Sequence, residues 1–407
     1  MSRKSSYLVL SIPSFRYFLA TRLFLTIGFQ MQAVIIGWEI YKVTGDPFSL
    51  GLVGLAEAIP AISIALYAGH IADIANRKTI LLFSLFALIL SSFGLLWSFS
   101  GLVQNSPKIY AVYAFICMSG FARGFYGPTA FALISQLVPK DILTNAGTLN
   151  STVWQFAAVI GPALGGFSYA YLGLNYSYIV IISLMLLAFL SLFQITYRFE
   201  PKPKSEEKIW DRLKEGLSFV YRSKIILSAL SLDLFSVLFG GATALLPVFA
   251  DEILKTGPEG LGILRAAPSL GAVIMMTILS LRPTIHEAGK ILIKAVGAFG
   301  LCMLLFGLSE NFYLSLFVLF LSGAFDSISV VIRSNILQVH TPDSMRGRVS
   351  AVNTIFIGSS NEIGAFESGL ASKLIGTANA VIFGGLMTLG IVGYTQLKAK
   401  ELKSLKF

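Results

Sequence analysis

Charged side chains are scarce in this sequence. Lysine, arginine, aspartate and glutamate make up 13% of its 407 residues, against about 25% in soluble domains. Hydrophobic residues reach 55%, compared with roughly 45–50% in soluble domains. Because a soluble fold could not bury so much apolar surface, the composition excludes that class and predicts a polytopic helical membrane protein.

Cysteine and histidine are also few, and enzyme signatures are missing. Cys117 and Cys302 each lie inside an apolar run, so we expect buried, inert thiols rather than a disulfide framework. His70, His286 and His340 lie at loop ends and form no cluster. No Walker-type glycine loop and no Ser/His/Asp arrangement appears. We therefore expect neither an enzyme nor a bound metal or cofactor.

Twelve apolar runs predict twelve membrane-spanning helices. They last about twenty residues or more, which is enough to cross a hydrocarbon core of about 30 Å. Arg16 and Arg22 interrupt the first run and no small-residue cleavage site follows, so a signal peptide is a poor fit. The predicted spans cover residues 15–40, 48–72, 79–100, 109–137, 142–171, 175–197, 225–250, 259–281, 290–309, 312–339, 345–375 and 378–396.

The second half of the chain repeats landmarks of the first. At an offset of 203 residues, Ser322-Gly323 aligns with Ser119-Gly120, Pro342 with Pro139, Asn353 with Asn150, Gly364 with Gly161, and Gly369 with Gly166. This constant register indicates an internal duplication. We therefore expect an all-α membrane fold of two pseudo-symmetric six-helix bundles, residues 1–199 and 225–407, joined by a linker over 200–224.

The linker is the only long polar segment. Within it, apolar residues recur at helical spacing on a basic background: Ile209, Trp210, Leu213, Leu217 and Val220. This pattern predicts a helix that lies in the membrane interface and joins the two halves.

Lysine and arginine are distributed unevenly among the predicted loops. With the N-terminus in the cytoplasm, the outside loops hold only Lys42, Lys108, Lys255 and Lys373. The positive-inside rule then places both termini and the linker in the cytoplasm, across a cell membrane such as the bacterial inner membrane. The formal charge of +10 is thereby explained by topology, with anionic lipid headgroups rather than nucleic acid as its partner.

The loop after the second span carries the motif Gly69-His-Ile-Ala-Asp73-Ile-Ala-Asn76-Arg77-Lys78. It resembles the loop 2–3 signature of the major facilitator superfamily, which has glycine, aspartate four residues later, then glycine and two basic residues. The resemblance implies a gate in which Asp73 faces a helix N-terminus and the basic pair anchors in the headgroups. Ile74 replaces a basic residue, and Asn76 replaces the turn glycine, where we expect a left-handed backbone. An ordinary basic loop is the alternative.

The fifth span carries a second motif, Gly161-Pro162-Ala-Leu-Gly165-Gly166. It resembles the antiporter motif of drug exporters in the same superfamily, although Ala157 stands in place of the upstream glycine. Proline removes a backbone donor and bends a helix, while glycine permits close helix contact. The resemblance favours export, and ordinary packing of small residues is the alternative.

The third and most specific stretch begins at Thr341. It reads Thr341-Pro342-Asp343-Ser-Met-Arg346-Gly347-Arg348-Val-Ser-Ala-Val-Asn353, followed by Ser360-Asn361-Glu362-Ile-Gly364 and Glu367-Ser-Gly369. It resembles the enterobactin-exporter-like branch of the superfamily, which includes siderophore exporters and drug:proton antiporters. The resemblance implies a monomeric transporter that exports a small organic molecule, driven by a proton gradient, with Arg346 and Arg348 in the gate. Ala365 stands where many relatives carry an acidic residue.

Ionisable side chains inside the predicted spans are expected to mark a transport pathway, because charge is costly there unless it faces a cavity or a partner. A structural ion pair is the alternative for each of them. Arg123 and Asp326 occupy equivalent positions in the two halves, on spans four and ten, which line the central cavity in this fold. The set comprises Arg22, Glu57, Arg123, Asp233, Arg265, Asp326, Arg333, Glu362 and Glu367.

We expect the substrate near the midplane between the two bundles, with access alternating by rocking of the halves. The residues predicted to line its cavity are Arg22, Gln30, Arg123, Tyr126, Trp154, Arg333, Asn361 and Glu362. The predicted proton-coupling acids are Asp233 and Asp326, then Glu57 and Glu367. A cation beside a carboxyl favours its charged form. Since Arg333 lies two turns from Asp326, Asp233 is favoured as the titrating acid and Asp326 as a substrate or ion-pair contact.

Two alternative functions are compatible with the same residues. A protein of the same fold could take up its substrate or move a lipid-like solute. It could also be a membrane receptor or scaffold that no longer transports, although such a protein has no functional need for the abundant midplane charges.

Overall fold

The computed structural model describes residues 8–100, 106–197, 209–281, 286–342 and 345–405. Throughout these ranges the regular secondary structure is helical, which confirms the all-α prediction. Nine helical stretches in this part of the chain are long and apolar enough to cross a membrane. Contacts group the chain into two units, which we describe separately. Unit 1 is Met1–Ile40 with Ala56–Glu206, and unit 2 is Tyr41–Leu55 with Glu207–Phe407.

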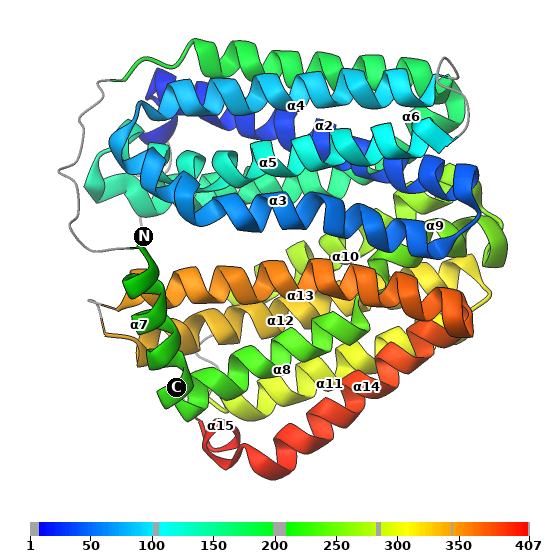
Figure 1. Cartoon of the computed structure of the whole chain (residues 1–407). Coiled ribbons are helices and arrows are strands. Elements are labelled where there is room, and N and C mark those ends of the chain that lie inside the picture. The colour runs from blue at the N-terminus through cyan, green and yellow to red at the C-terminus, as the bar shows by residue number, and fades with distance from the viewer. Residues whose placement is uncertain (1–7, 101–105, 198–208, 282–285, 343–344, 406–407) are drawn as a thin grey trace. The chain divides into compact units, whose positions relative to one another are not determined.

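The helices of the N-terminal half are shown in Figure 1. They are α2 (Pro13–Thr44), α3 (Pro47–Ile74), α4 (Arg77–Phe99), α5 (Ser106–Leu137) and α6 (Leu143–Phe193). In unit 1, α4 packs along α5 and against α6. The backbone of α6 leaves the helical conformation at Gly173, where φ is 74°. Glycine adopts this left-handed region without strain, and it lies between the two predicted spans 142–171 and 175–197.

The first helix after the linker ends before the predicted span 225–250 does. The helix α8 (Lys224–Gly240) ends at Gly240, and three short helical turns complete the predicted span 225–250: η2 (Ala242–Leu245), α9 (Leu246–Val248) and η3 (Phe249–Ile253). The remaining helices are α10 (Gly257–Ser280), α11 (Ala288–Leu308), α12 (Phe312–His340), α13 (Arg346–Ile375), α14 (Thr377–Lys398) and α15 (Lys400–Lys403). In this unit α10 packs along α12, and α11 packs along α14.

Glycines that align in the internal repeat make equivalent close contacts. A Cβ atom on Gly161 of α6 would lie 2.6 Å from the Cβ of Gln30 on α2. In the other half, a Cβ atom on Gly364 of α13 would lie 2.8 Å from the carbonyl oxygen of Leu238 on α8. Each half therefore needs glycine at the same place, because its helix backbones approach too closely for a larger residue.

The linker forms the helix α7 (Ile209–Arg222) in the described part, as its apolar spacing predicts. Its apolar stripe packs on protein: Val220 is fully buried in a cluster with Ile226, Val349 and Leu402. Glu215 of α7 forms an ion pair with Arg348 of α13 at 2.8 Å. Residues 200–208 of the predicted linker lie outside the described residues, and the interfacial position of α7 stays a prediction.

The loop between α3 and α4 differs from expectation in its backbone. Asn76 has an extended conformation, with φ −65° and ψ 112°, and its side chain accepts hydrogen bonds from the N–H groups of Lys78 and Thr79. The left-handed turn expected at Asn76 is therefore wrong. Asn76 instead caps the N-terminus of α4, where the first N–H groups lack helical partners.

Arg77 is buried rather than anchored in headgroups, which corrects a second expectation. Only 2% of the residue is exposed. Its Nε donates to the carbonyl of Ala72 on α3, and its NH1 group donates to that of Ala132 on α5, both at 2.9 Å. The planar guanidinium suits this double role, so Arg77 joins the end of α3 to α5.

We expect Arg77→Ala to destabilise the protein by about 1.5–3 kcal/mol, the range for a hydrogen bond to a charged group. The thermal midpoint of the purified protein in detergent measures this. The control is Arg16→Ala, because Arg16 is exposed on α2. Equal midpoints for the two variants would contradict a bonding role for Arg77.

Candidate functional site

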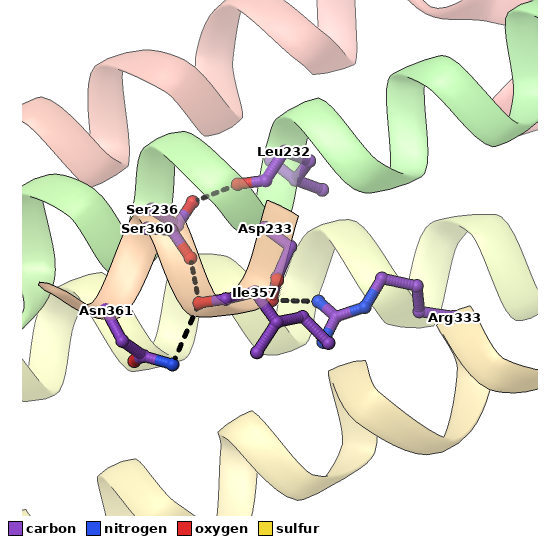
Figure 2. A network of polar contacts seen from close by, with 7 residues as sticks. All are labelled: Leu232, Asp233, Ser236, Arg333, Ile357, Ser360 and Asn361. Atoms are coloured by element: carbon purple, nitrogen blue, oxygen red, sulfur yellow. Dashed lines mark hydrogen bonds and ion pairs between the residues drawn. The ribbon is translucent and has the colours of Figure 1, made fainter. Parts of the chain in front are cut away.

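The most deeply buried charges of unit 2 form one ion pair. Asp233 on α8 contacts Arg333 on α12, with side chains only 9% and 5% exposed. Figure 2 shows the carboxylate and the guanidinium facing each other between the two helices. Because each ion alone is costly to bury, removal of either partner leaves an uncompensated charge. The pair therefore couples α8 to α12.

This pairing corrects the premise on which the sequence ranks the two acids, whereas their roles in proton coupling stay predictions. The sequence favours Asp233 as the acid farther from a cation, yet Asp233 holds the guanidinium of Arg333. Seven residues along a helix span about 10 Å, so Arg333 meets a side chain of the neighbouring helix instead of Asp326 on its own helix. The side chain of Asp326 forms no ion pair or hydrogen bond with any residue in the described ranges.

Glu367 on α13 is the second acid of this kind. It is partly buried, and its side chain too has no ion-pair or hydrogen-bond partner in the part of the chain that the structure describes. Its neighbour Glu362 differs, because it interacts electrostatically with Arg265 of α10. Among the predicted intramembrane acids of unit 2, Asp326 and Glu367 are thus the two that have no cation partner in the described ranges.

Hydroxyl and amide groups lie beside the Asp233–Arg333 pair. Figure 2 shows Ser236 on α8 and Ser360 with Asn361 on α13. The Ser236 hydroxyl donates to the carbonyl of Leu232 at 2.6 Å, and the Ser360 hydroxyl and Asn361 amide donate to that of Ile357 at 3.0 Å. Asn361 is exposed, so it can present its amide oxygen to a ligand.

Unit 1 contains its own group of charged and aromatic side chains. Glu57 on α3 forms an ion pair with Arg123 on α5, with side chains 20% and 42% exposed. The Arg123 guanidinium lies 4.1 Å from the ring centroid of Phe29 on α2, which is a cation–π arrangement. Arg22 lies beside the hydroxyl of the buried Tyr126. Glu57, a reserve candidate for proton coupling, is therefore paired with a cation.

Glu39 is an intramembrane acid outside the predicted set of site residues. It lies on α2 with 7% exposure, and its carboxylate accepts a hydrogen bond from the hydroxyl of Tyr169 on α6. The same helix contributes Gln32, whose amide oxygen accepts from Ser92 of α4 at 2.6 Å. The sequence signal for Glu39 is the presence of an acidic residue inside the apolar run 15–40.

The other predicted residues are dispersed. Gln30 packs against Gly161, and Trp154 is 43% exposed on α6. The buried motif residues Gly161, Pro162, Gly165 and Gly166 lie in α6, whose backbone stays helical through Pro162. Gly69 and Asp73 lie in α3, but the side chain of Asp73 is outside the described residues.

Arg346 and Arg348 begin α13. Arg346 donates to the carbonyl of Gln338 at 3.4 Å. The side chain of Arg348 is held by Glu215 of the linker helix. Both arginines therefore make contacts within unit 2 at the start of α13.

The hairpin Tyr41–Leu55, formed by the end of α2 and the start of α3, makes polar and aromatic contacts within unit 2. Lys373 of α13 forms an ion pair with Asp46 at 2.7 Å, and the Phe48 and Phe366 rings lie 5.5 Å apart. Partial burial raises the pKa of Asp46, but the Lys373 hydrogen bond, the Phe48 N–H and the Lys373 charge together lower it below its ordinary value. The Asp46 carboxyl is thus ionised near neutral pH.

The chain is similar to known proteins in sequence and in fold. The enterobactin exporter EntS of Escherichia coli O1:K1 / APEC is 26% identical over 404 residues, with 96% of this chain and 94% of the relative covered. A solved bacterial homologue of the iron transporter ferroportin, in an inward-facing state, has a TM-score of 0.73 at 15% identity, covering 96% of this chain and 99% of the other. A D-xylose–proton symporter has a TM-score of 0.71 at 13% identity, covering 97% and 99%.

The solved structures show that this chain shares their fold. The family model described as transmembrane secretion effector matches residues 4–406, nearly the whole chain. The resemblance seen in the motifs is thereby confirmed, as is the prediction of an integral membrane protein. The chain belongs to the transmembrane secretion effector family of the major facilitator superfamily, and it is a membrane transporter and not an enzyme.

Proposed function

We propose that this transporter is a proton-coupled exporter of a small organic molecule, either a siderophore or an amphipathic drug-like compound. The relatives named as enterobactin exporters support the substrate class and the direction. Proton coupling is supported by the environment of Asp326. This acid has no cation partner in the described ranges, although Arg333 on the same helix, α12, is paired with Asp233. The proposed transport cycle is alternating access. It takes place in a monomer that has two six-helix bundles and twelve membrane spans.

The two acids of this region have different roles in the proposal. A coupling acid must release and rebind a proton during the cycle, and a fixed guanidinium partner holds a carboxyl in its charged form. Asp233 has such a partner and therefore serves as a structural ion-pair member. Asp326 is the coupling acid, and Glu367 is the reserve. Arg22, Arg123, Tyr126 and Asn361 are the side chains proposed to contact substrate.

We expect Asp326→Asn to abolish substrate-dependent proton flux in proteoliposomes while downhill exchange of the substrate continues. Loss of the titrating carboxyl uncouples the proton without removing the fold. Enterobactin and an amphipathic dye, tested separately, are the substrates, and internal pH is followed by a fluorescent indicator. Asp141→Asn is the control, because Asp141 is an exposed aspartate.

Asp233→Asn should give a different result. It leaves the Arg333 charge buried and unpaired, at a cost of about 3–5 kcal/mol, so less folded protein is recovered. The double variant Asp233→Asn with Arg333→Gln should regain folded protein.

If Asp326→Asn retains full proton flux with either substrate, the coupling acid lies elsewhere and Glu367→Gln is tested next. If the wild type moves neither substrate, export of these compounds is wrong.

We further propose that both termini lie in the cytoplasm, in a bacterial inner membrane. The support is the lysine and arginine bias of the loops. An introduced cysteine at the exposed Lys255 should react with a membrane-impermeant maleimide in whole cells. An introduced cysteine at the exposed Ser404 should react only after lysis. The opposite pattern would overturn this orientation.

The hairpin Tyr41–Leu55 is proposed as one gate of the cycle. It rests on α13 through Asp46 and Phe48, and a Cβ atom on Gly54 would lie 3.1 Å from the Cβ of Ala365. An exposed ion pair is weak and easily broken, which suits a contact that must open in every cycle.

We expect Asp46→Asn to raise the labelling rate of an introduced cysteine at Ala365, because loss of the ion pair loosens the hairpin. Asp141→Asn, measured in the same background, is the control. Unchanged labelling in Asp46→Asn would remove the hairpin from the gate.

The sign of the pH dependence follows from the lowered pKa of Asp46. The stabilisation is fully present above the ordinary carboxyl pKa of about 4, and it is lost as pH falls through the lower folded-state value. Since the side chains of Asp46 and Lys373 are 31% and 52% exposed, the pair contributes about 0.2–1 kcal/mol. The difference in thermal midpoint between wild type and Asp46→Asn should therefore be constant from pH 8 to about 5 and shrink below about 4.

A further inference from the structure

A long groove runs between α8 and α14 of unit 2. Its volume is about 740 Å³, within the usual range of ligand sites. Leu227 and Phe239 mark its two ends along α8, twelve residues and therefore about 18 Å apart. That length is close to the thickness of one leaflet, which is half of a hydrocarbon core of about 30 Å.

The groove is separate from the buried ion pair. Its α8 residues Ser228, Ser231, Phe235 and Phe239 recur every three or four positions and so share one helix face. Asp233, two residues from Phe235 and Ser231, points to α12 on the opposite side of α8. The groove therefore lies on the outer side of the helix that carries the proposed ion-pair site.

The walls of the groove are apolar and open. Phe235 is 45% exposed, Leu386 is 54% exposed, and Tyr394 is 66% exposed. In a chain that spans a membrane, we expect such an exposed apolar surface to contact lipid acyl chains. The walls alone therefore suit a hydrocarbon chain but do not select among lipids.

One end of the groove is basic. Lys398 lines it at the end of α14, and Lys224 is the first residue of α8. Lys224 is 3.1 Å from Glu401 of α15, which places the start of α8 next to the residues that follow Lys398. Lys398 and Lys400 are exposed, and neither forms an ion pair with the described residues. The N-terminus of α8 adds the positive end of a helix dipole.

We propose that this groove binds an anionic phospholipid. One acyl chain lies along α8 and α14, and the phosphate contacts Lys398 and Lys224. Charge complementarity selects this occupant: a zwitterionic headgroup brings a cation to the same lysines, and a free anion would leave the apolar walls uncovered. The positive-inside rule predicts that the basic end faces the cytoplasm, on the side where anionic lipids attract basic residues.

Native mass spectrometry of the full-length protein tests the proposal with two lipids of equal chain length. Dioleoyl phosphatidylglycerol is the anionic probe, and dioleoyl phosphatidylcholine is the zwitterionic one. We expect preferential binding of phosphatidylglycerol, weakened roughly fivefold by Lys398→Ala, the ratio that about 1 kcal/mol per basic residue at the membrane surface gives. Lys294→Ala is the matched control, because Lys294 is an exposed lysine of α11 that does not line the groove.

A substitution that removes a negative charge provides a second test. Glu401→Gln removes the carboxylate that pairs with Lys224 and that repels a phosphate. We expect this variant to bind phosphatidylglycerol more tightly than the wild type. Equal binding of the two lipids by the wild type, or loss of phosphatidylglycerol in Lys294→Ala as large as in Lys398→Ala, would overturn the site.

A substitution in the apolar wall tests the acyl-chain part. Gly390 lines the groove, and a Cβ atom there meets no atom within 4 Å, so Gly390→Trp can fill it without a backbone clash. Gly393→Trp is the control, since Gly393 is equally open on α14 but does not line the groove. We expect only Gly390→Trp to reduce phosphatidylglycerol binding.

The same spectra report the mass of the protein, and so its oligomeric state. If the wild type is a dimer and Gly390→Trp is a monomer, a second copy of the chain occupies the groove and the lipid proposal is wrong. A monomer in both cases, with loss of lipid only in Gly390→Trp, supports it. Transport activity is not needed for any of these measurements, so they are independent of the proposed function.

Discussion

A buried charge in an apolar bundle needs a partner, and the Asp233–Arg333 ion pair is where this constraint acts most strongly. Both side chains are almost fully buried, in a chain with few charged residues to balance them. The pair connects α8 to α12. Asp233 therefore has a cationic partner, whereas the side chain of Asp326 has none among the described residues.

Close contact between helix backbones is the second constraint, and both halves meet it with the same residue type. Gly161 lies against α2, and Gly364 lies against α8. In a membrane, where apolar burial does not drive association between helices, close packing of small residues stabilises helix pairs. The equivalence of the two contacts explains why these glycines keep their register across the internal repeat.

Basic residues have several physical roles in this protein, although each contributes the same charge. Arg77 is buried and satisfies carbonyl groups of two helices. Arg348 holds the linker helix through Glu215, and Lys373 holds a hairpin through Asp46. Lys398 is exposed at the end of an apolar groove, where a lipid phosphate is the complementary charge.

The sequence by itself determined the all-helical membrane class and the family. Apolar runs long enough to cross a membrane, the repeat at Gly161 and Gly364, and the Thr341–Gly369 stretch are local patterns, and local patterns are read directly from sequence. Only the tertiary structure decided the partners. Arg333 pairs with Asp233, 100 residues away, and not with Asp326 two turns along its own helix. Asn76 caps α4 because its side chain accepts hydrogen bonds from N–H groups of that helix. Arg77 is buried because the carbonyl of Ala132 on α5 lies beside it. Pairing depends on which helix faces are brought together in space, and that arrangement follows from the packing of the whole chain.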